Sequence, residues 1–138
     1  MGLLRSQYMA KTTTYKTRSK YGNKKIEIDG NKFDSKLELY CYNMLKQLDI
    51  KFEFQKKEVL MDSFRYMNKA VREITLTVDF VANHNGITYY IDTKGFATDV
   101  SKIKYKMLRN KLKDNIYTDV VWLKNQKEVQ SFINKLIN

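Results

Sequence analysis

The chain has no proline, one cysteine and one histidine among its 138 residues, and each scarcity narrows the possible chemistry. The lone Cys41 excludes an internal disulfide and suits a reducing compartment, so a cytoplasmic location is expected. With His84 as the single histidine, a histidine-based triad and a zinc site with several His or Cys ligands are both disfavoured. No run of about 18 apolar residues occurs, so no transmembrane helix is expected.

Acidic residues are also few, which leaves a strong positive charge. The chain carries 26 Lys and Arg against 15 Asp and Glu, giving a formal net charge of +11. Such a balance favours a polyanionic partner, with nucleic acid as the first candidate and an anionic membrane surface as the second. The length and the 43% hydrophobic content fit one folded domain.

Residues 1–32 are predicted to form a basic N-terminal arm, which leaves 33–138 as the folded domain. Two interpretations stay open, a disordered tail and an arm that follows a DNA backbone. Residues 25–28, before Asp29-Gly30, could form a short edge strand. The candidate DNA-contacting residues in this arm are Arg18, Lys20, Lys24 and Lys25.

The periodicity of apolar residues predicts the remaining elements. Three- and four-residue steps predict helices over residues 35–48, 99–114 and 126–137. Strands are expected at about 51–60, at 119–123 and in a hairpin over 74–94, and residues 61–72 are predicted to be a polar connection. In the 99–114 helix the expected apolar side consists of Val100, Ile103, Met107, Leu108 and Leu112.

The order of these elements predicts an α/β fold. A strand, a helix and a second strand in succession favour a right-handed crossover and a parallel pairing. Hairpin strands pair antiparallel, so the central sheet should be mixed and should carry helices on both faces. The helix predicted over residues 126–137 is an extra C-terminal helix that follows this core.

Two acidic residues and a lysine lie within the predicted hairpin. If Asn85-Gly86 is a two-residue turn, Asp79 stands opposite Asp92, whereas a four-residue loop makes them diagonal neighbours. In both cases Lys94 shares their face, because side chains alternate along a strand. Facing carboxylates repel each other, and a cation between them would remove that repulsion. The alternative interpretation is an ordinary solvated hairpin face.

Basic residues also gather on the 99–114 helix, which contains no acid between residues 100 and 113. They predict a phosphate-binding surface, and a solvated helix face is the alternative. The candidate residues are Lys102, Lys104, Lys106, Arg109 and Lys113. Glu38 also has two interpretations. The motif of Ser35 followed by Glu38 fits a capping box in which Glu38 bonds the Ser35 N–H. A helix N-terminus can also face the edge of the sheet, which would place Glu38 in a functional site.

The ordered segments 33–38 (F-D-S-K-L-E), 50–54 (I-K-F-E-F), 77–80 (T-V-D-F) and 90–95 (Y-I-D-T-K-G) resemble the PD-(D/E)xK nuclease superfamily. Within it the chain looks similar to small phage endonucleases, including the type that resolves Holliday junctions. The resemblance covers about residues 33–123 and implies a restriction-endonuclease-like core of the order αβββαβ. Val78 stands in place of the motif's proline, and Asp92 stands where many members carry glutamate.

The resemblance implies a Mg²⁺-dependent endonuclease for branched DNA that works as a homodimer. It implies that Glu38, Asp79, Asp92 and Lys94 are catalytic. It also implies a metal, with Mn²⁺ able to substitute, held by Asp79, Asp92, the Thr93 carbonyl and Glu38. Ser35 and Lys36 join the expected DNA-contacting residues. The alternatives are a nuclease for linear duplex DNA and a DNA-binding protein with a vestigial site.

Overall fold

A four-stranded mixed sheet lies at the centre of the computed structural model, which describes residues 17–18 and 24–138. The strand order is β4 (Lys51–Met61), β7 (Ile74–His84), β8 (Ile87–Thr93) and β9 (Thr118–Leu123). The first three pair antiparallel, and β9 pairs parallel to β8. The predicted mixed sheet and its parallel crossover are therefore confirmed.

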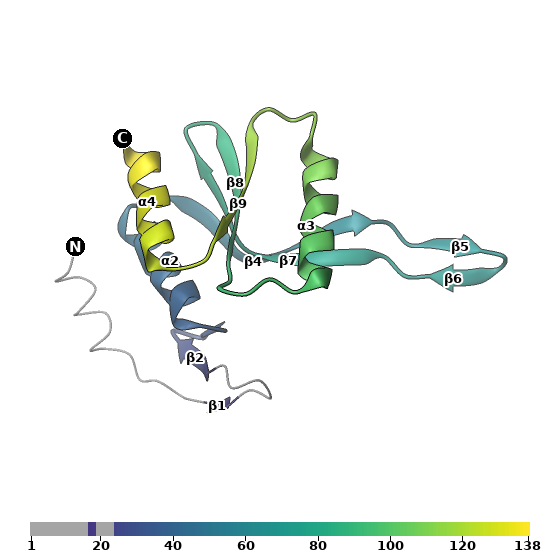
Figure 1. The fold of residues 1–138 in the computed structure, drawn as a ribbon, viewed down its shortest axis with the longest axis horizontal. Coiled ribbons are helices and arrows are strands. Elements are labelled where there is room, and N and C mark those ends of the chain that lie inside the picture. Colours follow the sequence, from purple (N-terminus) through teal and green to yellow (C-terminus); the bar gives the residue numbers. More distant parts are fainter. Residues whose placement is uncertain (1–16, 19–23) are drawn as a thin grey trace.

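Helices cover both faces of this sheet (Figure 1). α2 (Lys36–Gln47) and α4 (Gln126–Ile137) pack on one face, where Leu45, Phe80 and Ile133 are buried. α3 (Asp99–Leu112) packs on the other face through a smaller cluster. In the part of the chain that the structure describes, no helix is both long and apolar enough to cross a membrane.

A short hairpin precedes α2 and forms part of the core. It joins β2 (Lys24–Ile28) to β3 (Asn31–Phe33), and its second strand leads into the helix. Ile26 and Phe33 are buried in the same cluster as α2 and α4. The folded domain therefore includes this hairpin, and the boundary expected at residue 32 lies inside it. Upstream, β1 (Thr17–Arg18) pairs with β2.

The turn between β7 and β8 has two residues, as the Asn-Gly pair predicts. Asn85 and Gly86 have φ values of 52° and 79°, and His84 pairs with Ile87 across the turn. Positive φ at both central residues is the geometry that matches the twist of a hairpin. The alternative four-residue loop is wrong, and this register brings Asp79 and Asp92 to adjoining strand positions.

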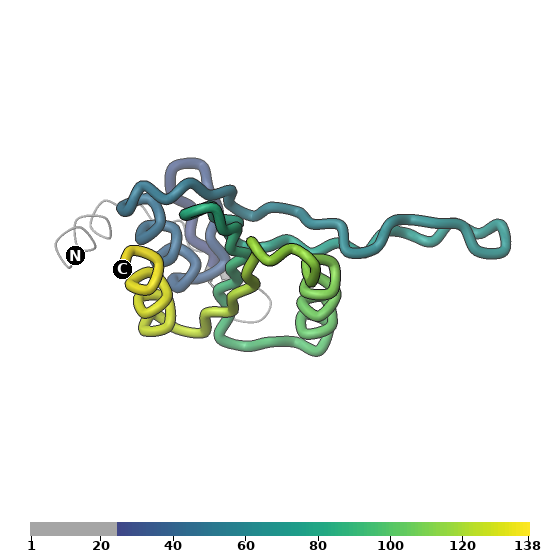
Figure 2. The backbone as a smooth tube through the Cα atoms, turned by 90° about the horizontal axis from the view of Figure 1, so that it is seen from above, coloured from purple at the N-terminus to yellow at the C-terminus, as the bar shows by residue number. Residues whose placement is uncertain are grey.

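The polar connection expected over residues 61–72 is wrong, because these residues form a second hairpin. β5 (Phe64–Tyr66) pairs antiparallel with β6 (Lys69–Val71). The two strands project far from the body of the molecule in both perpendicular views (Figures 1 and 2). They continue the direction of β4 and β7, which frame them in the sequence. We refer to residues 62–73 as the ribbon.

α3 presents to the sheet only part of the face expected, since Leu108 and Leu112 pack there as predicted. Tyr105 and Leu108 are buried, whereas Val100 and Ile103 are 61% and 58% exposed. The ring of Tyr105 packs edge-on against Trp122 of β9, with their centroids 5.0 Å apart. Apolar residues recur on two sides of this helix, and this aromatic contact accompanies the side that is buried.

Candidate functional site

Three carboxylates from separate elements are buried near the middle of the sheet. The β7–β8 ladder ends at Phe80 and Ile91, so Asp79 and Asp92 stand at the next position along. They are 8% and 0% exposed, and Glu38 of α2 is 2% exposed. Burying charged groups is costly unless they are paired or bind a cation. Their proximity makes this cluster the strongest candidate site in the described residues.

Asp79 is oriented by the strand beside it. Its Oδ2 accepts hydrogen bonds from the backbone N–H of Thr93 at 2.9 Å and from the Thr93 hydroxyl at 3.0 Å. Burial and the neighbouring Asp92 carboxyl together raise the pKa of Asp79 well above its usual range. The resemblance expects the Thr93 carbonyl at the site, whereas the contacts seen here use its N–H and hydroxyl.

Asp92 is the most exceptional of the three groups. Both of its carboxylate oxygens are buried and accept no hydrogen bond from any residue that the structure describes. The Nζ of Lys94 lies 3.8 Å from Oδ2. A buried polar group without partners demands an explanation, and a bound ion is one. Asp79, Asp92 and Lys94 thus lie close together, as predicted.

Glu38 has a structural role and also faces the cluster. The Ser35 hydroxyl caps α2 by accepting from the Glu38 N–H at 3.1 Å, as predicted. The return bond goes to the Asp34 N–H at 3.4 Å, and the expectation that it would reach the Ser35 N–H is wrong. Burial and the nearby Asp34 carboxylate raise the pKa of Glu38 to about 7.

Gln55 of β4 fixes the side chain of Glu38. Its Nε2 donates to Glu38 Oε1 at 3.1 Å and to the Lys32 carbonyl at 3.4 Å. Gln55 has φ of 54° inside a strand, a left-handed conformation that side-chain-bearing residues rarely adopt. Such strain of about 1–3 kcal/mol collects at functional sites. Sequence analysis missed this residue, because periodicity carries no sign of an unusual φ.

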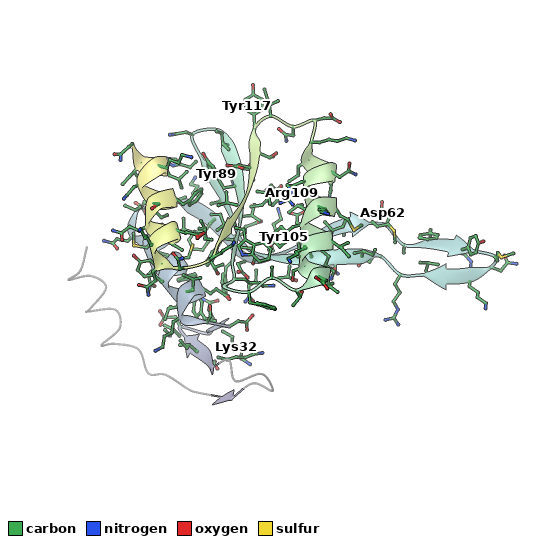
Figure 3. The ribbon with its side chains drawn as sticks, viewed as in Figure 1. Lys32, Asp62, Tyr89, Tyr105, Arg109 and Tyr117 are labelled. Carbon is green, nitrogen blue, oxygen red and sulfur yellow. The ribbon has the colours of Figure 1, made fainter. Side chains whose placement is uncertain are left out.

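Tyr105 of α3, labelled in Figure 3, packs against Trp122 of β9, which pairs with Asp92 in the sheet. The buried Tyr105 hydroxyl lies near the carboxylates, since burial and then Asp92 raise its pKa. Trp122 Nε1 donates to the Lys94 carbonyl at 2.7 Å. Trp122 pairs with Asp92 in the parallel ladder, so β9 holds both ends of the Asp92–Lys94 segment. The sequence analysis missed both roles.

The donor set suits a hard cation held by two carboxylates. Among the described residues, no group of three or more His, Cys, Asp or Glu side chains is arranged to hold a metal ion. Glu38 is turned to Gln55 and to the Asp34 N–H, which leaves Asp79 and Asp92 as the pair. Mg²⁺ is usually bound by one or two carboxylates, with water and phosphate completing its octahedron. The unpartnered Asp92 oxygens fit that mode.

Cys41 lies close to these carboxylates but is not a nucleophile. Its side chain is fully buried in the main core cluster. Burial, followed by the charges of Asp79 and Glu38, raises the pKa of the thiol. A buried thiol with a raised pKa is inert, because the thiolate is the reactive form. Cys41 is therefore a core residue.

The predicted basic residues are distributed over the surface. Lys102, Lys106, Arg109 and Lys113 are exposed on α3, and Lys104 is half-buried. Lys36 is exposed at the start of α2, and Ser35 is its N-cap. The Nζ of Lys25 lies 3.9 Å from Oδ1 of Asp34 and forms an ion pair with it. The side chains of Arg18 and Lys24, and all of Lys20, lie outside the described residues.

Together, the fold and these side chains define a mixed α/β protein with a buried carboxylate cluster where β7, β8 and α2 meet. The chain belongs to the family described as protein of unknown function (DUF1064), whose profile matches residues 18–130. That stretch includes the ribbon and every side chain of the cluster. No curated protein matches the chain.

Proposed function

We propose that the protein is a Mg²⁺-dependent DNA endonuclease that hydrolyses phosphodiester bonds in branched DNA. One observation carries the proposal. Asp92 is fully buried, neither of its carboxylate oxygens accepts a hydrogen bond from the described residues, it adjoins Asp79, and its Oδ2 lies 3.8 Å from Lys94 Nζ in an ion pair. Two carboxylates can hold a divalent cation, and a neighbouring ammonium group can stabilise the charge that develops on a phosphate.

Asp79 and Asp92 would hold the cation. The two hydrogen bonds from Thr93 fix the orientation of Asp79 through Oδ2. The other carboxylate oxygen of Asp79 and the carboxylate of Asp92 would remain available to hold the cation. When bound, the cation would offset the charge of the substrate phosphate and favour ionisation of a water molecule.

Lys94 would act on the reacting phosphate. Its side chain is 44% exposed, so its ammonium group can reach a substrate that approaches from solvent. Its backbone is held by the Trp122 indole, which limits the positions that Nζ can take. The ammonium group of Lys94, fixed at this point, would orient the attacking water and stabilise the negative charge that develops in the transition state.

Glu38 and the basic face of α3 complete the proposed site. Glu38, held by Gln55, would accept a hydrogen bond from a water at the cluster. The exposed basic residues of α3 would bind phosphates on either side of the scissile bond. Cutting two strands of a junction symmetrically would require two copies of the chain, so the proposal includes a homodimer.

The test compares wild type with Asp79→Asn and Asp92→Asn on labelled four-way, flap, duplex and single-stranded DNA, with and without Mg²⁺. Both variants should lose cleavage and keep DNA binding, because they remove a ligand charge and preserve the shape of the side chain. Mg²⁺ should raise the melting temperature of wild type more than that of either variant, since it binds the folded state. Full cleavage by Asp92→Asn would refute the site.

Lys94→Ala separates catalysis from binding. Its cleavage rate should fall by about 10²-fold, or roughly 2.7 kcal/mol, with little change in DNA affinity. A large loss of affinity with an unchanged single-turnover rate would make Lys94 a phosphate anchor. DNA binding without cleavage of any substrate by wild type would favour a vestigial site. Equal cleavage of linear and four-way DNA would remove the branched substrate from the proposal.

A further inference from the structure

The ribbon exposes large apolar side chains in a part of the molecule that contributes nothing to the core. Phe64, Tyr66 and Met67 are 48%, 66% and 80% exposed. In Figures 1 and 2 the ribbon projects away from the sheet and helices in both views. A two-stranded hairpin is marginally stable alone, and exposed apolar patches mark sites of interaction. The ribbon therefore has the properties of a contact surface.

The tip of the ribbon is set in one conformation. Met67 and Asn68 have φ values of 47° and 62°, the positive pair expected of a tight hairpin turn. The Arg65 Nη2 donates to the Asn68 carbonyl at 2.7 Å, which ties the first strand to the turn. Binding through such a preorganised element loses little conformational entropy.

The chemistry of the ribbon favours a nucleic acid over a protein surface. Three basic residues and no acid occur between residues 64 and 72, and the two acids of the ribbon, Asp62 and Glu73, lie at its base. Glu73, at its base, lies 3.3 Å from Lys57, which offsets its charge. A two-stranded ribbon fits the major groove of DNA, and apolar tips such as Met wedge between base steps in the minor groove. Basic residues beside an apolar tip suit both phosphates and bases.

The ribbon also lies at a useful distance from the carboxylate cluster. Asn68 lies eleven positions before Asp79 in the chain. A strand rises about 3.4 Å per residue, so the two residues are separated by up to about 37 Å. One turn of duplex DNA measures about 34–36 Å. A duplex bound at the cluster and running along the ribbon would therefore meet the tip one helical turn away.

We propose that the ribbon is a second DNA contact, with Tyr66 and Met67 entering a groove about one helical turn from the cluster. The proposal rests on the proposed function only in taking DNA as the partner. Two linked contacts on one duplex reinforce each other, because the second becomes intramolecular. A short duplex can occupy either contact but not both at once.

The experiment measures DNA affinity by fluorescence anisotropy in an Asp79→Asn background, so that binding is read without cleavage. The test variant is Tyr66→Ser with Met67→Ser. The matched control is Ile116→Ser with Tyr117→Ser, which removes two side chains that are 80% and 63% exposed before β9. The probes are a hairpin duplex of about 6 base pairs, which is shorter than the distance between the two contacts, and a linear duplex of about 30 base pairs, three helical turns long.

The ribbon variant should bind the long duplex at least tenfold more weakly than the control and the short duplex no more than about twofold more weakly. Equal affinities of the ribbon and control variants for the long duplex would overturn the proposal. An equal loss on both duplexes would overturn the spacing of one turn. A dimer of the parent protein that becomes a monomer in the ribbon variant would assign the ribbon to contact between copies and also overturn it.

The two proposals fail in different ways. Cleavage by Asp79→Asn would refute the nuclease site, and affinities measured without Mg²⁺ would still be readable as evidence for the ribbon. Loss of the length-dependent effect would refute the ribbon and leave the cleavage results intact. Absence of binding to either duplex by the parent protein would refute the ribbon and leave cleavage of branched DNA to its own test. Circular dichroism spectra that match the parent would exclude misfolding as the cause of a weaker affinity.

Discussion

Replacing Glu38 with glutamine should change the sign of its effect on stability between acid and alkaline pH. Burial raises the pKa of Glu38 from 4.5 to about 7, so the folded state holds its proton longer than the unfolded state. The wild type therefore loses stability as pH rises from 4.5 to 7, and the full cost is present above that window. At 1.36 kcal/mol per pKa unit, this cost is about 3 kcal/mol.

Glutamine removes the charge but disturbs two hydrogen bonds. Both Glu38 oxygens accept, from the Gln55 amide and from the Asp34 N–H. An amide offers one acceptor, so one donor loses its partner at a cost of about 1–2 kcal/mol. Glu38→Gln should therefore be less stable than wild type by about 1–2 kcal/mol at pH 4.5. At pH 8 it should be more stable by a similar amount, because the charge cost of about 3 kcal/mol is gone.

The assay is urea unfolding of both proteins at pH 4.5, 6 and 8 in the presence of a chelator. The matched control is Glu53→Gln, since the Glu53 side chain is 65% exposed and pairs with Lys56. Its effect should not change sign over this range. Mg²⁺ at pH 8 should reduce the advantage of Glu38→Gln, because a nearby cation favours the ionised glutamate. A difference in stability that is constant with pH would refute the reasoning.

Three further variants or treatments test the surroundings of the cluster. Gln55→Gly should be more stable than Gln55→Ala by about 1 kcal/mol in urea unfolding, because φ is 54° at this residue. A more stable Gln55→Ala, as in an ordinary strand, would show that the backbone here is not strained. Tyr105→Phe should keep the unfolding free energy within about 1 kcal/mol, since the Tyr105 hydroxyl has no hydrogen-bond partner among the described residues. Its rate of cleavage should fall, and an unchanged rate would mean that Tyr105 serves in packing alone. Cys41 should resist alkylation at pH 8 until the protein unfolds, as mass spectrometry would detect, and rapid labelling of the native protein would contradict its burial.

Local chemistry explains which parts of the fold are predictable from sequence. Asn85-Gly86 specifies its own turn, since both residues tolerate positive φ, and that turn fixes the register that brings Asp79 and Asp92 together. Ser35 caps α2 with groups three residues apart. These features depend on neighbours in the chain, so a pattern of residue types is sufficient to find them.

Features set by distant contacts were not predictable in this way. α3 carries apolar residues on two sides, and contacts of Tyr105 and Leu108 with distant strands distinguish the buried one. No residue of the ribbon is buried in the core that the structure describes, so residues 61–72 lack an apolar stripe and resemble a loop in sequence. The strained φ of Gln55 accompanies its bonds to Glu38 and Lys32, both far away in the chain.

The hydrogen bond from Trp122 to the Lys94 carbonyl has a consequence for protein synthesis. It joins residues 28 positions apart, across the whole of α3 and into the last strand. Parallel pairing of this kind forms late, because a long crossover must close before any contact rewards it. A chain still emerging from the ribosome would carry Asp79, Asp92 and Lys94 but lack the strand that holds them in place. The cluster can therefore assemble only after β9 has been synthesised, which would delay any activity until that strand is in place.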